Sequence, residues 1–185
     1  RLPGKNVRPL SGKPLMAWSI LAARESSLFK KIMLSTDSPD YEAIGEEYGA
    51  EVPWLRAPGL AGDEVSSIDV IIDILNRFSD EGRHFSHITL LQPTSPLRTA
   101  TDIIAAWKLM QQKRAGAVVS VSECEHPPQW SNTLPKDLSM KDFVTPEALV
   151  LRHKPEKCYR VNGAIYMAET SLFRKHRSFF TPHTY

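Results

Sequence analysis

The run His87-Ile88-Thr89-Leu90-Leu91 is followed at once by the polar turn Gln92-Pro93-Thr94-Ser95-Pro96-Leu97-Arg98. The first run is apolar and contains two β-branched residues, which predicts a buried strand. An amphipathic pattern over 99–112 predicts a helix capped near Thr101 or Asp102. Residues 117–121 (Ala-Val-Val-Ser-Val) predict the next strand. Strands alternating with helices indicate an α/β fold with a doubly wound, mainly parallel sheet.

The same alternation extends toward the N-terminus. Pro14 favours the start of a helix over 15–25, because the missing N–H of proline costs nothing in a first helical turn. Ser66 and Ser67 precede an apolar pattern of helical period. The other predicted elements are a short strand at 31–36, a helix at 40–48, a short strand and loop at 49–54, and a helix at 68–78. An α/β domain normally opens with a buried strand, so we expect a strand to precede Arg1.

The pattern breaks between Glu123 and Arg160, where five prolines lie among polar residues without a clear period. This stretch is too long for an ordinary connection in a compact domain. It is either a disordered insertion or an arm that packs on a partner. Strand character resumes over 163–168, and we expect the whole of 1–185 to form a single domain around the inserted segment 123–160.

Composition excludes several classes of protein. Lys and Arg number 23 against 21 Asp and Glu, a net charge of +2, which gives no case for nucleic-acid binding. No apolar run approaches the ~18 residues of a membrane-spanning helix, and no secretory leader is visible. Cys124 and Cys158 have no metal or redox spacing, which favours reduced thiols in a cytoplasmic protein.

Three polar residues can be interpreted in two ways. Asp37 follows a predicted strand, where α/β sites are built, or it caps the helix at 40–48. Arg56 and Ser67 could contact a base or ribose. From the residues alone, a surface ion pair for Arg56 and a helix cap for Ser67 are the simpler interpretations.

Two further segments suit a sugar, which has apolar ring faces and a polar rim. Two prolines, Pro93 and Pro96, follow Gln92 closely and are expected to hold its backbone for recognition. Asn162 and Tyr166 are four residues apart on a predicted strand and therefore point to the same side. Phe179 and Phe180 follow, although buried phenylalanines are more often part of a core.

Taken in order, these segments resemble the cytidylyltransferases that activate nine-carbon acidic sugars, above all N-acylneuraminate (sialic acid) cytidylyltransferase. The resemblance spans nearly the whole chain, and the stretches around Gln92 and Asn162 are the most specific. The resembling segments are Leu2-Pro3-Gly4-Lys5-Asn6, Ser35-Thr36-Asp37, Leu55-Arg56-Ala57-Pro58, Ser66-Ser67, Leu91-Gln92-Pro93-Thr94-Ser95-Pro96-Leu97-Arg98, Glu125-His126-Pro127, Tyr159-Arg160-Val161-Asn162-Gly163-Ala164-Ile165-Tyr166 and Ser178-Phe179-Phe180.

The resemblance implies a nucleotide-diphospho-sugar transferase-like fold, a homodimer with 123–160 as its dimerisation arm, and Mg²⁺ as cofactor. It assigns Lys5 and Asn6 to the triphosphate and cytidine, with Lys5 catalytic, and Arg56 and Ser67 to the nucleotide. It assigns the sugar pocket to Gln92, Asn162, Tyr166, Phe179 and Phe180, with Arg152 supplied by the partner subunit. The metal-binding Asp-x-Asp of the family would follow Tyr185, and an Arg-x-x-Ser-Lys stretch would precede Arg1, so no metal ligand is expected within 1–185.

The reaction that the resemblance implies joins CTP and N-acetylneuraminate, or a related nonulosonic acid, to give the CMP-sugar and pyrophosphate. Two alternatives stay open. One is a legionaminate-type cytidylyltransferase, whose sugar differs in its N-acyl and C9 groups. The other is a non-catalytic relative that binds a CMP-sugar or a partner protein.

Overall fold

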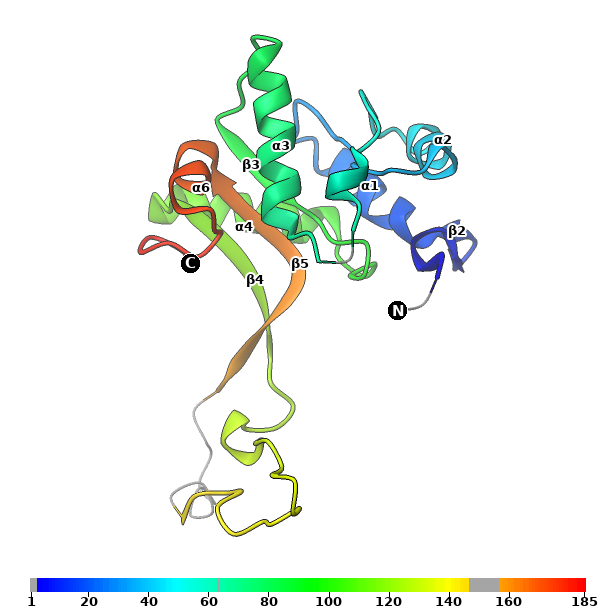
Figure 1. Cartoon of the computed structure of the whole chain (residues 1–185). Helices are drawn as coiled ribbons and strands as arrows, with labels where there is room; N and C mark the ends of the chain where they lie inside the picture. The colour runs from blue at the N-terminus through cyan, green and yellow to red at the C-terminus, as the bar shows by residue number, and fades with distance from the viewer. Residues whose placement is uncertain (1–2, 63, 147–156) are drawn as a thin grey trace. The chain divides into compact units, whose positions relative to one another are not determined.

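The structure is a computed structural model that describes residues 3–62, 64–146 and 157–185 (Figure 1). Arg152 lies outside the described residues. The chain forms two compact units. The first unit comprises residues 1–120 and 163–185, and the second comprises Val121–Asn162. Their placement relative to each other is not defined.

The helices of the first unit begin where local signals favour them, and three of the capping residues differ from the expected ones. Thr99 caps α4 and forms a reciprocal capping box with Asp102, two to three residues before the expected cap at Thr101 or Asp102. Ser38 caps α2, and Ser66 caps α3. The helices are α1 (Leu15–Ser26), α2 (Pro39–Glu47), α3 (Ser67–Asp80), α4 (Ala100–Lys113) and α6 (Thr170–His176), with short 3-10 turns η1 (Lys5–Val7) and η2 (Pro58–Leu60).

The described sheet contains three strands in the order β3-β5-β4, which are β3 (His87–Leu90), β4 (Ala117–Glu123) and β5 (Tyr159–Glu169). β3 pairs antiparallel with β5, with Leu90 opposite Tyr166. β4 also runs antiparallel to β5, since Glu169 N–H donates to Gly116 O, while Ile165 N–H donates to Ser120 Oγ four residues along in the opposite direction.

The expected mainly parallel sheet therefore differs from the observed pairing. β3 and β4 point the same way, as consecutive strands joined by α4 should. β5, which follows the long segment 123–160, lies between β3 and β4. These two strands therefore each pair antiparallel with β5 instead of pairing parallel with each other. Parallel pairing among the described residues is limited to isolated bridges, Met33 with Glu51 and Ala117 with Thr184.

The predicted strand at 31–36 is also shorter than expected. It forms a single bridge, in which Leu34 N–H donates to Glu51 O and Glu51 N–H donates to Ile32 O. β3 in turn is half-buried rather than buried, because it lies at the edge of the described sheet. A small antiparallel pair, β1 (Pro9–Leu10) with β2 (Lys13–Pro14), precedes α1.

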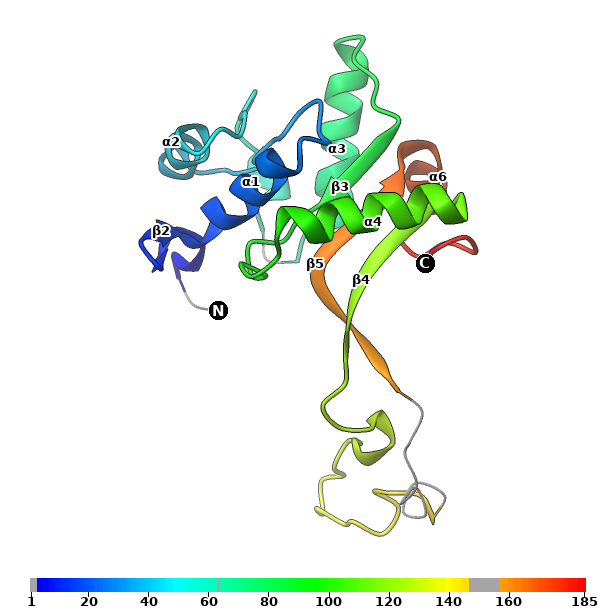
Figure 2. The same ribbon diagram turned by 180° about the vertical axis from the view of Figure 1, so that it is seen from behind.

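Helices cover both faces of this sheet (Figure 2). Alternate residues of β4 and β5 enter opposite core clusters: Val118 and Ile165 pack with α1 and α4, whereas Val119 and Ala168 pack with α3 and α6. This layering confirms the α/β class and places Leu90 and Tyr166 on the face covered by α3 and α6.

The second unit contains the 3-10 turn η3 (Pro128–Trp130) and the outer ends of β4 and β5. Cys124 N–H donates to Cys158 O at 2.8 Å, and Asn162 Nδ2 donates to Ser122 Oγ at 2.9 Å. The expected arm at 123–160 covers nearly the same residues. Within the described ranges, no helix is both long and apolar enough to cross a bilayer.

Candidate functional site

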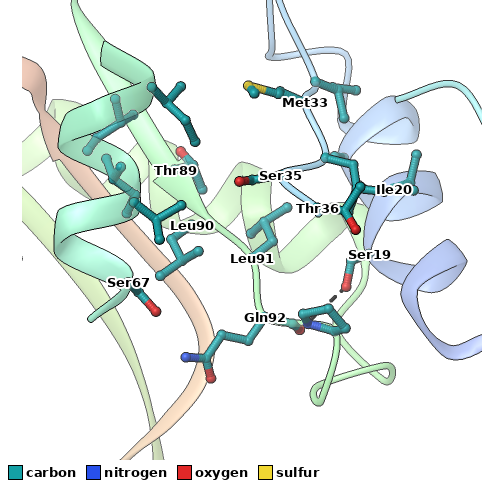
Figure 3. A pocket seen from close by; sticks show the side chains of 18 of the residues that line it. Ser19, Ile20, Met33, Ser35, Thr36, Ser67, Thr89, Leu90, Leu91 and Gln92 are labelled. Carbon is teal, nitrogen blue, oxygen red and sulfur yellow. Dashed lines mark hydrogen bonds between the residues drawn. The ribbon is translucent and has the colours of Figure 1, made fainter. Parts of the chain in front are cut away.

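A cavity of about 580 Å³ lies in the first unit, between α1 and the segment 31–37 on one side and α3 and β3 on the other (Figure 3). Every residue from Lys31 to Asp37 and from His87 to Pro93 lines it. Side chains of an extended segment point alternately to opposite faces, so one face would contribute only every second residue. Since every residue lines the cavity, the cavity runs along the backbone edges of both segments.

The cavity has an apolar part and a set of polar lining residues. Apolar side chains of α1 and α3, among them Ile20, Ile71 and Phe78, line the first part. In Figure 3, Ser67 and Gln92 lie at the end of the cavity away from Met33. The polar lining residues include Asn6, Ser35, Thr36, Asp37, Arg56, Ser67 and Gln92. Four of the residues expected to bind substrate, Asn6, Arg56, Ser67 and Gln92, thus share one cavity.

Asn6 is the second residue of η1, whose N-cap Gly4 has a φ of 64°, in the left-handed region that favours glycine. Its side-chain oxygen Oδ1 is buried and has no hydrogen-bond partner among the described residues. A buried acceptor without a donor is costly, so this oxygen is suited to receive a ligand N–H or O–H. Lys5, its neighbour, is exposed and does not line the cavity.

Among the described residues, Arg56 has no partner for the surface ion pair that its sequence context suggested. Its Nε donates to Ser35 Oγ at 3.1 Å and its Nη2 donates to the Ser35 carbonyl, while its backbone N–H donates to Thr36 O at 2.7 Å. These bonds hold a cation at the wall of the cavity without a carboxylate to neutralise it among these partners.

Neither Ser67 nor Asp37 caps a helix, because a neighbouring serine does so in each case. Ser66, not Ser67, accepts the Asp69 N–H at 3.1 Å and caps α3. Ser38, not Asp37, accepts the Tyr41 N–H at 3.4 Å and caps α2. The capping interpretation is therefore wrong for both residues, and both line the cavity.

The Gln92 turn is tied down through its main chain. The carbonyl oxygen of Gln92 accepts hydrogen bonds from Ser95 N–H at 3.2 Å, Ser19 Oγ at 3.4 Å and Arg98 Nη1 at 3.3 Å. Arg98 Nη1 also donates to Ala164 O on β5 at 2.8 Å. Sequence reasoning included Arg98 in a motif but gave it no role; its position directly before the α4 cap was the only available signal.

Arg98 is only 6% exposed, and its Nε and Nη2 have no hydrogen-bond partner among the described residues. Burial lowers the pKa of Arg98 to about 10, against the opposing effect of the Asp102 carboxylate. The guanidinium is therefore held in the interior at an energetic cost.

Gly163 provides the space for the side chain of Gln92. Its φ is +75°, which L side chains rarely adopt, and a β-carbon there would collide with Gln92 Oε1 and lie 3.4 Å from Gln92 Cδ. In Figure 3 the Gln92 side chain points toward the ribbon of β5. The side chain of Gln92 in the turn thus packs against the backbone of Gly163 in β5.

The other residues expected in the sugar pocket lie in different surroundings. Tyr166 is half-buried, with its ring centroid 5.3 Å from that of Phe179. Phe179 is 4% exposed and packs against Phe173 in the core, as the alternative interpretation had it, whereas Phe180 is 58% exposed. None of the three lines the cavity. Asn162 belongs to the second unit.

No three His, Cys, Asp or Glu side chains gather into a metal-binding group in the part of the chain that the structure describes. Asp37 is the one carboxylate among the described residues that line the cavity. These residues do not assemble a metal site by themselves.

A layered α/β fold with a cation, hydroxyls and amides lining a cavity at strand ends is typical of enzymes that bind nucleotides. The fold resembles that of CMP:2-keto-3-deoxy-manno-octonic acid synthetase complexed with CTP, with a TM-score of 0.67 at 15% identity over 95% of this chain and 71% of that one. The chain belongs to the cytidylyltransferase family, whose model matches residues 1–183, and it is a nucleotidyltransferase.

Two curated relatives are similar in sequence. A CMP-N,N′-diacetyllegionaminic acid synthase of Legionella pneumophila is 38% identical over 100% of this chain and 79% of the relative. An N-acylneuraminate cytidylyltransferase of Streptococcus agalactiae serotype V is 37% identical over 100% of this chain but 44% of the relative. The chain therefore spans most of the first relative and less than half of the second.

Proposed function

We propose that this protein transfers the cytidylyl group of CTP to a nine-carbon acidic sugar, giving the CMP-sugar and pyrophosphate. The observation that carries the proposal is the shared cavity: Asn6, Arg56 and Ser67, expected at the nucleotide, line the same space as Gln92, expected at the sugar. Residues up to 86 positions apart in sequence meet there, as expected for a fold that builds one site for two substrates.

The nucleotide would bind through Asn6, Arg56 and Ser67. The unpartnered Oδ1 of Asn6 is an acceptor for the exocyclic amine of cytosine or a hydroxyl of ribose. Arg56, whose bonds go to Ser35 rather than to a carboxylate, retains its positive charge for phosphate. The Ser67 hydroxyl, at the first turn of α3, lies at the positive end of the helix dipole.

The sugar would bind on the sheet face covered by α3 and α6. Leu90 and Tyr166 lie on this face, and Gln92 follows Leu90 by two residues. The exposed ring of Phe180 can pack on an apolar sugar face, while the buried Phe179 supports Tyr166 from behind. Asn162 and the partner subunit's arginine at position 152 remain predictions that rest on the resemblance.

In the proposed reaction the anomeric hydroxyl of the sugar attacks the α-phosphorus of CTP in line. A bond forms between that oxygen and phosphorus, the bond to pyrophosphate breaks, and the hydroxyl proton is released. No covalent enzyme intermediate is required, so positioning and charge neutralisation supply the catalysis. The exposed Lys5 would neutralise charge on the departing pyrophosphate.

The remaining expectations come from the resemblance. Mg²⁺ would be held by the Asp-x-Asp pair that the resemblance places after Tyr185 and would neutralise phosphate charge, because the described side chains form no metal-binding group of their own. We also propose a homodimer in which 123–160 forms the interface, and a cytoplasmic location. Sedimentation equilibrium of the natural-length protein tests the dimer, and a monomer at micromolar concentration would contradict it.

Pyrophosphate release by the natural-length protein tests the function. We expect release with CTP and a nonulosonic acid, and none when either is omitted. Gln92→Ala and Tyr166→Phe should raise the KM for the sugar by about tenfold and leave the KM for CTP within about twofold, because both act on one substrate. Equal effects on both substrates would contradict the pocket assignment, and CMP-sugar binding without turnover would favour a non-catalytic relative.

A second sugar has specific support. The Legionella relative, named for N,N′-diacetyllegionaminic acid, matches along the whole of this chain. N-acetylneuraminate and N,N′-diacetyllegionaminate should therefore be assayed side by side. The higher kcat/KM identifies the substrate, since discrimination between substrates is the ratio of these values.

A further inference from the structure

Arg98 is buried more completely than any other charged side chain among the described residues. The contacts of its guanidinium do not account for this burial as a gain in the stability of the fold. One nitrogen, Nη1, donates to two carbonyls, and the other two nitrogens have no partner within the described ranges. A buried cation with incomplete hydrogen bonding usually costs more free energy than it returns.

The two carbonyls that Arg98 contacts belong to segments 72 positions apart, the Gln92 turn after β3 and Ala164 on β5. The β3–β5 ladder ends at the pair Leu90–Tyr166, so Gln92 and Ala164 lie beyond its last registered pair. The side chain of Arg98 thus connects the two segments just beyond the last residue pair of the β3–β5 ladder.

The link coincides with the closest approach of the two segments. Gly163, next to Ala164, leaves the space that the Gln92 side-chain amide occupies. Displacing the Gln92 main chain by about 1 Å would move that amide away from Gly163 and from its place in the cavity wall. Misplacement of a binding group on this scale is enough to weaken recognition substantially.

We propose that Arg98 is a positioning residue for sugar recognition: it holds the Gln92 main chain against Ala164 so that the Gln92 amide is presented over Gly163. This inference rests on the proposed function, because it takes Gln92 to contact the acidic sugar. Arg98 itself does not touch the substrate.

The test compares Arg98→Met, Arg98→Lys and Arg24→Met in the natural-length protein. Arg98→Met keeps the length of the side chain and removes both links, and Arg98→Lys retains a donor. Arg24 is the matched control, because its Nη1 also joins two segments by donating to a carbonyl, that of Tyr48 at 2.9 Å, away from the Gln92 turn. Measurements are KM for sugar and for CTP, kcat, and Tm.

We expect Arg98→Met to raise the sugar KM about tenfold with the CTP KM unchanged, Arg98→Lys to recover part of the loss, and Arg24→Met to leave both KM values unchanged. The Tm of Arg98→Met should stay close to the native value, since an apolar side chain of similar size replaces a costly buried charge.

Equal loss toward both substrates together with a large fall in Tm would make Arg98 merely structural and overturn the inference. An unchanged sugar KM in Arg98→Met would overturn it as well. Absence of pyrophosphate release in the native protein is a different result, since it removes the proposed function and the role of Arg98 with it.

Discussion

The side-chain amide oxygen of Gln92 occupies the space that a β-carbon at position 163 would need, and glycine stands there with φ of +75°. Two demands therefore fall on one residue. The backbone at position 163 has a conformation that glycine adopts freely. The Gln92 side chain, in the turn after β3, also needs position 163 of β5 to have no β-carbon. The pair joins the most specific segments of the sequence in one contact.

Gly163→Ala should separate these demands from general backbone strain. We expect a loss of about 1 kcal/mol of stability from the positive φ and, in addition, a sugar KM raised by about tenfold as the Gln92 amide is displaced. Gly82→Ala is the matched control, because Gly82 has φ of +72° and nothing within 4 Å of the added carbon. If both variants lose stability and keep the native sugar KM, the Gln92–Gly163 contact has no part in recognition.

Asn6→Ala should weaken CTP binding without destabilising the protein. The Oδ1 of Asn6 is buried and unpartnered, so its removal relieves an unmet hydrogen bond in the free protein and removes a ligand contact in the complex. Isothermal titration with CTP and thermal melts measure the two effects. In the control Asn76→Ala, which removes an acceptor already bonded to Arg174 Nη1 at 2.6 Å, CTP affinity should be unchanged. A fall in Tm for Asn6→Ala with native CTP affinity would contradict the assignment.

Lys5→Ala should lower kcat by about a hundredfold and leave the fold intact, since an exposed lysine contributes little to stability while neutralising charge in a transition state is worth several kcal/mol. The measurement is pyrophosphate release at saturating CTP and sugar, with circular dichroism as the check on folding. Lys30→Ala, at another exposed lysine, is expected to match the native kcat. Native turnover in Lys5→Ala would remove this residue from the mechanism.

The apolar part of the cavity bears on the strand expected before Arg1. The segments 31–37 and 87–93 line it with consecutive residues, so both present backbone edges to it, between apolar walls. If a strand precedes Arg1, a protein extended by that strand should melt at a higher temperature than residues 1–185 alone, because the strand would bury this surface and pair both edges.

A proline placed at the centre of that upstream strand is the control, because proline cannot donate to a ladder between two neighbours. The proline variant should lose the gain in Tm. An extension that raises Tm equally with and without the proline would show that the added residues stabilise by some other route.

Local signals in the sequence predicted the elements that depend on nearby residues. The apolar period predicted the helix α4, whereas its reciprocal cap, formed by Thr99 and Asp102, begins two to three residues before the expected position. The capping residues of α2 and α3 were misassigned by one position. Because Ser38 and Ser66 cap these helices, the side chains of Asp37 and Ser67 are not used as caps and line the cavity. Periodicity locates a helix end only to within a residue or two.

The sequence by itself determined the α/β class, the segments proposed to bind the substrates and the break in pattern after Glu123, because residue type, spacing and helix signals are properties of short stretches. Tertiary structure alone decided that β5 lies antiparallel between β3 and β4, that Phe179 is in the core, and that Arg98 reaches across 66 positions to Ala164. The reason is physical: strand order, burial and the pairing of a buried charge depend on which distant segments pack together, and no local pattern encodes that choice.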